Sequence, residues 1–158
     1  ASHQLPAKHR LHRQAANVQG TVLWYAKAVV DNPGNYGMLL RTDYWRYPAL
    51  QPLMPFIDGD APSKPKKVKA KHERDGCYLT WKAPKGKGWQ NEAHRYVVYR
   101  FLPGEPLDTD DPSKIVGMPY DNRLRLDYKD GRTKYIYVVT ALDRMSNESI
   151  GKKKKVKL

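Results

Sequence analysis

Few side chains in this sequence could do chemistry, and no catalytic group is complete. Asp31 directly follows an apolar run, in the turn Asp31-Asn32-Pro33-Gly34, where aspartate is a common turn former. The sequence contains no Gly-x-Ser-x-Gly elbow, phosphate-binding loop, dinucleotide fingerprint or His-Glu-x-x-His pair. We therefore expect no catalysis by this chain alone.

Three histidines, His3, His9 and His12, lie near the amino end, but no cysteine or carboxylate lies near them in sequence. They are expected to be solvated side chains of a helix rather than metal ligands. Cys77 is the only cysteine, which excludes a disulfide framework and a cysteine-based zinc site. Because it lies in an alternating apolar stretch, we expect it to be buried and unreactive. No cofactor or metal is predicted.

The formal net charge of +13 is concentrated in the second part of the chain. Residues 62–158 hold 23 Lys and Arg against 12 Asp and Glu, whereas residues 1–61 hold 6 against 4. Such a surface attracts polyanions in general, whether nucleic acid, acidic polysaccharide or anionic lipid headgroups. No apolar run reaches 18 residues and no signal-peptide core is present, so we expect neither a transmembrane helix nor a targeting signal.

The elements that would position a site are mostly short strands. Thr133–Ser149 places apolar residues on both faces and then enters a polar turn, which is typical of a central strand. Short alternating stretches with turn signals between them continue through residues 62–158 and predict a mainly β fold, a seven-stranded sandwich. The expected strands are 66–72, 77–82, 95–101, 114–118, 123–128, 133–142 and 150–158.

Residues 1–61 have an α/β pattern instead. Leu5–Val18 carries a narrow apolar stripe and predicts a helix, Thr21–Tyr25 predicts a strand buried on both faces, and Tyr36–Tyr47 predicts a second helix. Five prolines between residues 48 and 65 then exclude helix and sheet interior, although the stretch is apolar. We expect this connection to lie extended against a folded surface, with the domain boundary near residues 60–63.

Four features of the β region occur together. Pro65 opens the first strand, Trp81 lies in the second, Tyr96-x-Val98-Tyr99-Arg100 forms the third, and Tyr135-x-Tyr137-x-Val139-x-Ala141 forms the sixth. The set resembles a fibronectin type III module over residues 62–158. The resemblance implies that Trp81 and Tyr96 are structural core residues. It also implies that Tyr135 is a tyrosine-corner residue, whose hydroxyl bonds to backbone just upstream.

The first part carries a second resemblance. Val18-Gln19-Gly20 enters the apolar strand, and Tyr47-Pro48-Ala49-Leu50 leads to Pro52-x-Met54-Pro55. These pieces resemble the carboxyl end of a glycosyl-hydrolase-like family-10 (β/α)8 barrel. In that family the two helices and the strand between them would be the seventh helix, eighth strand and eighth helix. The carboxylates of glycoside hydrolysis come from several strand ends, so the partners of Asp31 would lie on other repeats.

The barrel resemblance also assigns sugar contacts. Trp24, Tyr25 and Lys27 would lie at the carboxyl end of the eighth strand, where substrate contacts cluster, unless the two aromatic rings only pack the barrel. A fibronectin type III module after such a barrel is familiar in secreted bacterial carbohydrate-active proteins. The resemblance therefore implies a secreted, periplasmic or cell-surface protein, with the rest of the barrel as partner.

Lysines dominate the first and last strands of the β region. They could form one basic surface for polyanions, or simply block edge-to-edge strand pairing. Nucleic acid is disfavoured because almost no aromatic residue interrupts the lysines. We expect an accessory, non-catalytic part of a glycosyl hydrolase that supports or spaces the barrel and could also contact acidic glycan. The alternatives are a protein-interaction or adhesion module and, less favoured, a polyanion binder. The lysines concerned are Lys66, Lys67, Lys69, Lys152, Lys153, Lys154 and Lys155.

Overall fold

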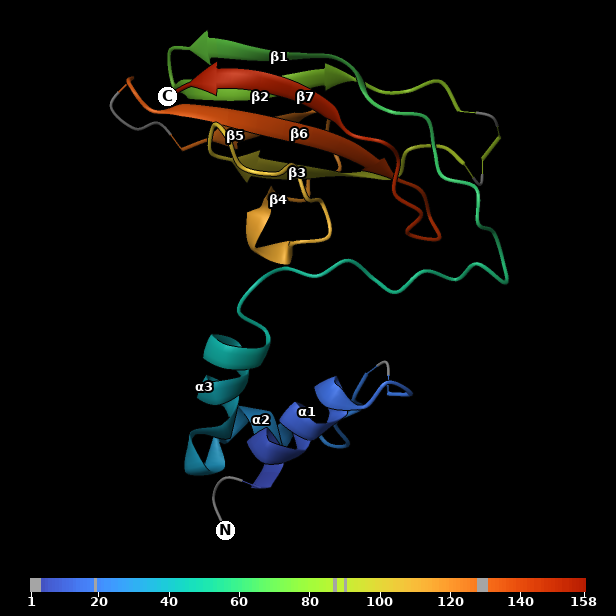
Figure 1. Cartoon of the computed structure of the whole chain (residues 1–158), viewed down its shortest axis with the longest axis vertical. Coiled ribbons are helices and arrows are strands. Elements are labelled where there is room, and N and C mark those ends of the chain that lie inside the picture. Colours follow the sequence, from blue (N-terminus) through green and yellow to red (C-terminus); the bar gives the residue numbers. More distant parts are fainter. Residues whose placement is uncertain (1–3, 19, 87, 90, 128–130) are drawn as a thin grey trace. The chain divides into compact units, whose positions relative to one another are not determined.

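The computed structural model describes residues 4–18, 20–86, 88–89, 91–127 and 131–158 (Figure 1). The predictions that concerned His3, Gln19 and Tyr128 lie outside these residues. The chain forms two compact units, Ala1–Pro48 and Ala49–Leu158.

The first unit is helical. It contains α1 (Gln4–Gln14), α2 (Lys27–Val30), η1 (Pro33–Asn35), α3 (Tyr36–Leu39) and η2 (Leu40–Tyr44). The helix predicted over Leu5–Val18 is confirmed by α1, and the one over Tyr36–Tyr47 by α3 and η2, which follow each other directly. The fully buried Leu40 and the nearly buried Tyr36 are its main interior side chains.

The strand predicted over Thr21–Tyr25 is wrong, because these residues form no strand. Val22 and Trp24 are instead more than 90% exposed. A parallel strand needs neighbouring strands to take up its backbone hydrogen bonds, and the first unit supplies none within its described residues.

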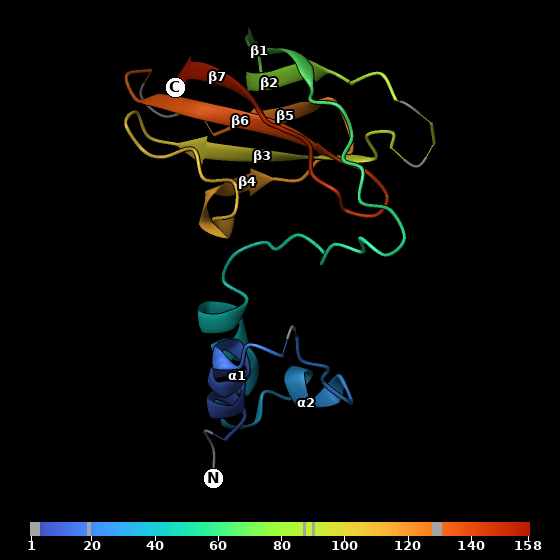
Figure 2. The ribbon, with the colours of Figure 1, turned by 45° about the vertical axis from the view of Figure 1, so that its right-hand side comes forward.

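The second unit is a sandwich of two antiparallel sheets (Figure 2). One sheet has the order β1-β2-β5 and the other β4-β3-β6-β7, so β6 is central and β1 and β7 are edge strands. This confirms the predicted seven-stranded sandwich of fibronectin type III or immunoglobulin-like type. The strands are β1 (Lys66–Glu73), β2 (Gly76–Lys82), β3 (Arg95–Phe101), β4 (Ile115–Gly117), β5 (Arg123–Leu126), β6 (Lys134–Leu142) and β7 (Lys152–Lys157), with η3 (Pro112–Lys114) before β4.

Two apolar clusters lie on opposite faces of the four-stranded sheet. The cluster between the sheets contains Trp81, Tyr96 and Val139. The cluster on the outer face contains Tyr99, Phe101 and Val138, and Tyr99 and Phe101 are at most 1% exposed. The predicted double-sided apolar character of β6 thus reflects two separate layers of packing.

The connection, residues 49–61, belongs to the sandwich unit. The sequence placed the domain boundary near residues 60–63, whereas the compact units divide after Pro48. The physical reason is that Leu50 packs against the outer-face cluster and the carbonyl oxygen of Asp58 accepts a hydrogen bond from Asn147. Among the described residues, no helix is long and apolar enough to cross a membrane.

Candidate functional site

The predicted sugar-contact residues do not form a pocket together. The Trp24 side chain is 93% exposed and that of Tyr25 is 63% exposed. Lys27 forms an ion pair with Asp31, one helical turn later. The backbone of Tyr25 has φ 79°, a left-handed conformation that is uncommon for a bulky residue. Within this unit these side chains present an open aromatic and apolar surface.

His9 of α1 is packed against tyrosines, whereas His12 is only partly buried. His9 is only 8% exposed, against the expectation of solvated rings, because its Nε2 lies 2.8 Å from the hydroxyl of Tyr36 and its ring stacks on that tyrosine. Burial, and then the charges of His12 and Arg13, lower the pKa of His9. His12 contacts the Thr21 hydroxyl at 3.0 Å. Among the described residues no group of three His, Cys, Asp or Glu could hold a metal.

The connection is fastened to the sandwich by two asparagines. Asn147 Nδ2 donates to the Asp58 carbonyl at 3.1 Å, and Asn91 Nδ2 donates to the Asp60 carbonyl at 2.8 Å. Asn147 lies in the exit loop, residues 143–149, where Asp143 Oδ1 accepts hydrogen bonds from the Met145 and Asn147 amides. The same loop therefore closes the end of β6 and holds the connection.

The large apolar side chains of the connection that lie between Leu50 and Asp58 are exposed. The sequence predicted that the connection lies against a folded surface, but among its large apolar side chains this holds only for Leu50, which packs on the outer-face cluster. The four other apolar side chains stand in solvent between Leu50 and Asp58 and form an exposed apolar ridge. Its members are Leu53 (59% exposed), Met54 (42%), Phe56 (83%) and Ile57 (55%). Apolar side chains that are held in place and exposed together are typical of protein interfaces.

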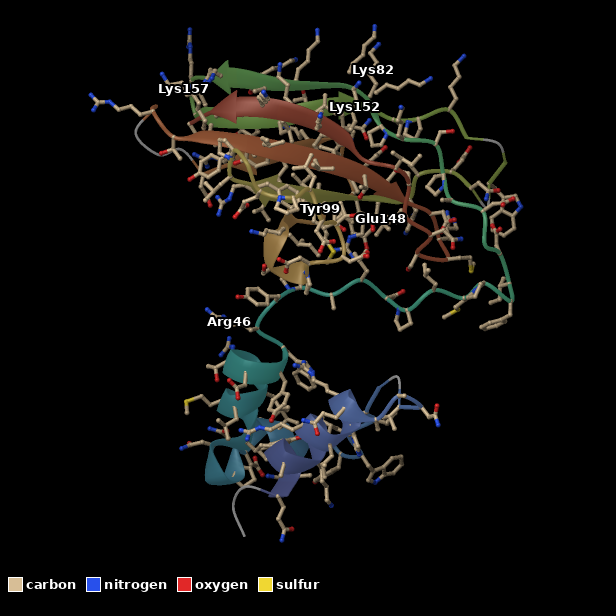
Figure 3. The ribbon with its side chains drawn as sticks, in the orientation of Figure 1. Arg46, Lys82, Tyr99, Glu148, Lys152 and Lys157 are labelled. Carbon is tan, nitrogen blue, oxygen red and sulfur yellow. The ribbon has the colours of Figure 1, made fainter. Side chains whose placement is uncertain are left out.

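A partly buried carboxylate, Glu148, joins the exit loop to the outer face of the sheet. Glu148 Oε1 accepts a hydrogen bond from the Tyr99 hydroxyl at 2.7 Å and another from the Thr140 hydroxyl at 2.5 Å (Figure 3). Burial, and then the bond to Glu148, raise the pKa of Tyr99 far above its usual value. Phenol and carboxylate thus act as a structural pair, with the proton on the tyrosine.

The structural residues predicted by the sequence lie in or beside the inner core. Trp81 is 5% exposed, and its ring meets that of Tyr96 edge to face with centroids 5.2 Å apart. Tyr135 is half-buried beside this core, with the Arg100 guanidinium 5.1 Å from its ring centroid. Its predicted hydroxyl bond to upstream backbone stays a prediction, because residues 128–130 lie outside the described residues. Cys77 is buried, and burial raises the pKa of its thiol.

The predicted basic lysines come together on one side of the sandwich. β1 and β7 belong to different sheets but approach each other with Cα atoms within 8 Å. Val68 of β1 and Val156 of β7 enter the same inner core, while the neighbouring lysines are exposed. We call this set the lysine strip; it contains Lys66, Lys67, Lys69, Lys71, Lys82, Lys152, Lys153, Lys154, Lys155 and Lys157.

Sequence reasoning missed the anchors of the connection and the Glu148 contacts. Asn91, Asn147 and Glu148 are single polar residues in loops, and a loop asparagine usually suggests only a turn. The available signal for docking was the apolar, proline-rich composition of the connection, which did not show which loops would hold it.

No family model matches this chain. A curated relative, "Glycosyl hydrolase YngK" of Bacillus subtilis (strain 168), is 32% identical over 148 residues, which is 93% of this chain. The chain spans 28% of the length of that relative.

Two solved structures are similar to the chain at TM-scores below 0.5. A Fn3-like protein from Clostridium thermocellum is 24% identical, with a TM-score of 0.45, over 61% of this chain and 92% of that chain. The structure of "FN3tt mut" is 15% identical, with a TM-score of 0.47, over 61% of this chain and 94% of that chain.

Proposed function

We propose that this chain is an accessory part of a glycosyl hydrolase, in which the sandwich and its connection support a catalytic barrel formed by other parts of the parent protein. The observation that carries the proposal is the 32% identity to a glycosyl hydrolase over 93% of the chain. A match of that length includes residues of both units, because the first unit holds 48 of the 158 residues. The helical unit, the connection and the sandwich are therefore similar to the relative in sequence along one continuous stretch.

The exposed apolar residues supply the physical argument for a barrel partner. Val22 and Trp24 of the first unit are 92% and 93% exposed. Burying such side chains stabilises a protein by roughly 1.5–3 kcal/mol each, so a partner surface would be expected to cover them. More than two thirds of the relative lies outside the matched region, which leaves ample chain for that partner. In a complete barrel, residues 21–25 would gain the neighbouring strands that the first unit lacks.

Contact with a barrel partner would also explain the exposed apolar ridge. Phe56 and Ile57 are held between the anchors at Leu50 and Asp58 rather than left on a free tether. A tethered spacer between independent domains would be polar and mobile, whereas a docking element is apolar and fixed. We assign the ridge to contact with the parent barrel, and we assign the hydrolytic carboxylates to strand ends of that barrel. A secreted or cell-surface location is part of the same proposal.

The test uses the parent protein encoded by the complete gene. We expect the parent to release reducing ends from a polysaccharide panel, while residues 1–158 alone release none. Replacing Phe56 and Ile57 with serine in the parent should separate barrel and sandwich melting into two calorimetric transitions. A matched control, Gln51→Ser with Asp108→Ser, changes exposed residues outside the ridge and should keep one transition.

Two results would overturn the proposal. One is a parent gene without βα repeats beside this region. The other is a parent protein that cleaves no glycan but captures a protein ligand through the sandwich, as an adhesion module would.

A further inference from the structure

The lysine strip carries more charge than the protection of a sheet edge requires. Lysines on an edge strand help to stop it from pairing with another chain, as do prolines, bulges and short length. Here four consecutive lysines, Lys152–Lys155, are exposed on both faces of β7. Further exposed lysines stand on β1 and at the end of β2. Figure 3 shows Lys152 and Lys157 at the two ends of β7, with Lys82 on the same side of the sandwich.

The strand register shows how the charges are distributed. Lys152 and Lys154 lie opposite Val139 and Tyr137, whose side chains belong to the inner core. Cross-strand partners share a face, so these two lysines project on the inner face of β7, toward the side where β1 lies. Lys153 and Lys155 project on the outer face. The charges therefore surround β7 along its length, which is roughly 20 Å at the rise of a β-strand.

Lysines of the strip lie directly opposite other lysines and are repelled by them. Lys66 lies directly opposite Lys82, and Lys157 lies directly opposite Lys134. Like charges in such pairs destabilise a sheet. Within the described part of the chain, the ion pairs are Lys27–Asp31, Lys114–Glu105 and Arg123–Glu73, and none involves the strip. An uncompensated cationic surface of this kind is suited to an anionic ligand that supplies the missing charges.

The strip is rigid rather than a mobile tail. Leu158, which follows β7, is fully buried, and its amide donates to the Thr133 carbonyl at 2.8 Å. Val156 is anchored in the inner core. A ligand therefore meets lysines on a fixed backbone, and only side-chain entropy is lost on binding.

We propose that the lysine strip binds a linear acidic polysaccharide, a polymer that carries carboxylate or phosphate groups along its length; this inference rests on the proposed function. The strip consists of lysines, which act as point charges, and contains no arginine fork of the kind that recognises phosphates bidentately. No Phe, Tyr or Trp side chain is exposed on the described strands β1 and β7. The strip therefore lacks the stacking platforms on which single-stranded nucleic acid is held. It would keep the parent enzyme near an acidic polymer while the barrel acts on it.

The test measures binding by residues 1–158 to four probes: polygalacturonate for carboxylates, dextran phosphate for phosphates, neutral dextran and single-stranded DNA. We expect binding to at least one of the two acidic probes, no binding to dextran, and weaker binding to DNA. The two acidic probes distinguish carboxylate from phosphate recognition. Affinity should fall steeply between about 50 and 200 mM salt, because counterions are released on binding.

The variant K152Q/K154Q should weaken acidic-probe binding by about tenfold and lower the logarithmic salt slope by roughly two. The control K8Q/R144Q removes two exposed charges outside the strip and should bind as the unchanged protein does. Equal affinity of both variants, tighter binding of DNA, or binding of dextran would overturn the proposal. If residues 1–158 bind an acidic probe but the parent protein hydrolyses no glycan, the proposed function is rejected. The proposal that the lysine strip binds acidic polysaccharide then still stands.

Discussion

The side-chain amide of Asn147 donates a hydrogen bond to the backbone carbonyl of Asp58, 3.1 Å away and 89 positions earlier in the chain. The same nitrogen donates to Asp143 Oδ2 at 2.9 Å, and Asn147 is 5% exposed. One buried amide thus satisfies both a carboxylate of the exit loop and the backbone of the connection. The position of the connection depends on Asn147 together with Asn91 and Leu50, because residues 49–61 form no strand or helix.

Replacing Asn147 with alanine should release the connection. Asp143 and the Asp58 carbonyl each lose a donor, so we expect the free energy of unfolding to fall by about 1–3 kcal/mol. Chymotrypsin should then cut faster at the exposed Phe56, since local opening precedes cleavage. Urea denaturation and the rate of limited proteolysis measure the two effects.

The matched control is Asn122→Ala, which changes an exposed asparagine of the same unit. It should alter stability by no more than about 0.5 kcal/mol and leave the cleavage rate unchanged. An unchanged cleavage rate for Asn147→Ala itself would contradict the role of this residue as the anchor.

Glu148 provides a second prediction, because two hydroxyl groups donate to one of its oxygens. Replacing Glu148 with alanine leaves the buried Tyr99 and Thr140 hydroxyls without their acceptor and should cost about 2–4 kcal/mol. Glutamine keeps a carbonyl oxygen of nearly the same shape, so Glu148→Gln should cost less than half as much. Chemical denaturation of both variants gives the comparison, and equal losses would show that shape rather than the acceptor matters.

The buried tyrosines predict a loss of stability in alkali. Burial is the leading cause that raises the pKa of Tyr96, Tyr99 and Tyr137 above the usual value of about 10. The folded state therefore holds protons that the unfolded chain releases first. Stability is fully present below pH 10 and is lost as pH rises toward the folded pKa values, by about 1.4 kcal/mol per pH unit for each tyrosine.

The measurement is urea denaturation at pH 8 and pH 11 with ultraviolet detection of tyrosinate. Tyr99→Phe removes one of these groups, so its stability should fall less between the two pH values than that of the unchanged protein. Tyr120→Phe changes a tyrosine that is 62% exposed and serves as the control. The same alkaline slope in all three proteins would be inconsistent with a buried, protonated Tyr99.

Most strands of the sandwich could be predicted from the sequence, because the alternation of side chains between the two faces of a strand can be recognised from a few consecutive residues. The alternation around Tyr135 and Tyr137 indicated β6, and Lys66–His72 indicated an edge strand guarded by lysines, which is β1. The approach of β1 to β7, by contrast, depends on how two sheets pack. The sequence showed lysines at both ends of the β region, and the shared core of Val68 and Val156 brings them together.

The errors arose where a residue depends on partners that lie far away in sequence or that the described residues do not supply. Thr21–Tyr25 has the composition of a buried strand, but composition cannot supply neighbouring strands. His9 was expected in solvent because its partner Tyr36 is 27 positions away. The apolar connection indicated docking, yet it could not show that Leu50 packs inward while Phe56 remains exposed.

Gly151, which directly precedes β7, lies too close to Val138 of β6 to carry a side chain. A Cβ atom at this position would lie 2.3 Å from Cγ1 of Val138, a branched and nearly buried side chain of the outer-face cluster. Val138 has little freedom to move, because a β-branched side chain has one strongly preferred rotamer in packed surroundings. Gly151→Ala should therefore push the start of β7 away and cost about 1–3 kcal/mol.

Gly59 is the matched control, since a Cβ atom there meets nothing within 4 Å. Gly59→Ala restricts the unfolded chain without a clash and should be neutral or stabilise the protein by up to about 1 kcal/mol. Opposite signs for the two substitutions in thermal denaturation would support tight packing of β7. Because Lys152 directly follows Gly151, the displaced strand should also carry the lysine strip with it. Gly151→Ala should then weaken acidic-polymer binding even though every lysine is retained; unchanged binding would mean that the strip does not depend on the placement of β7.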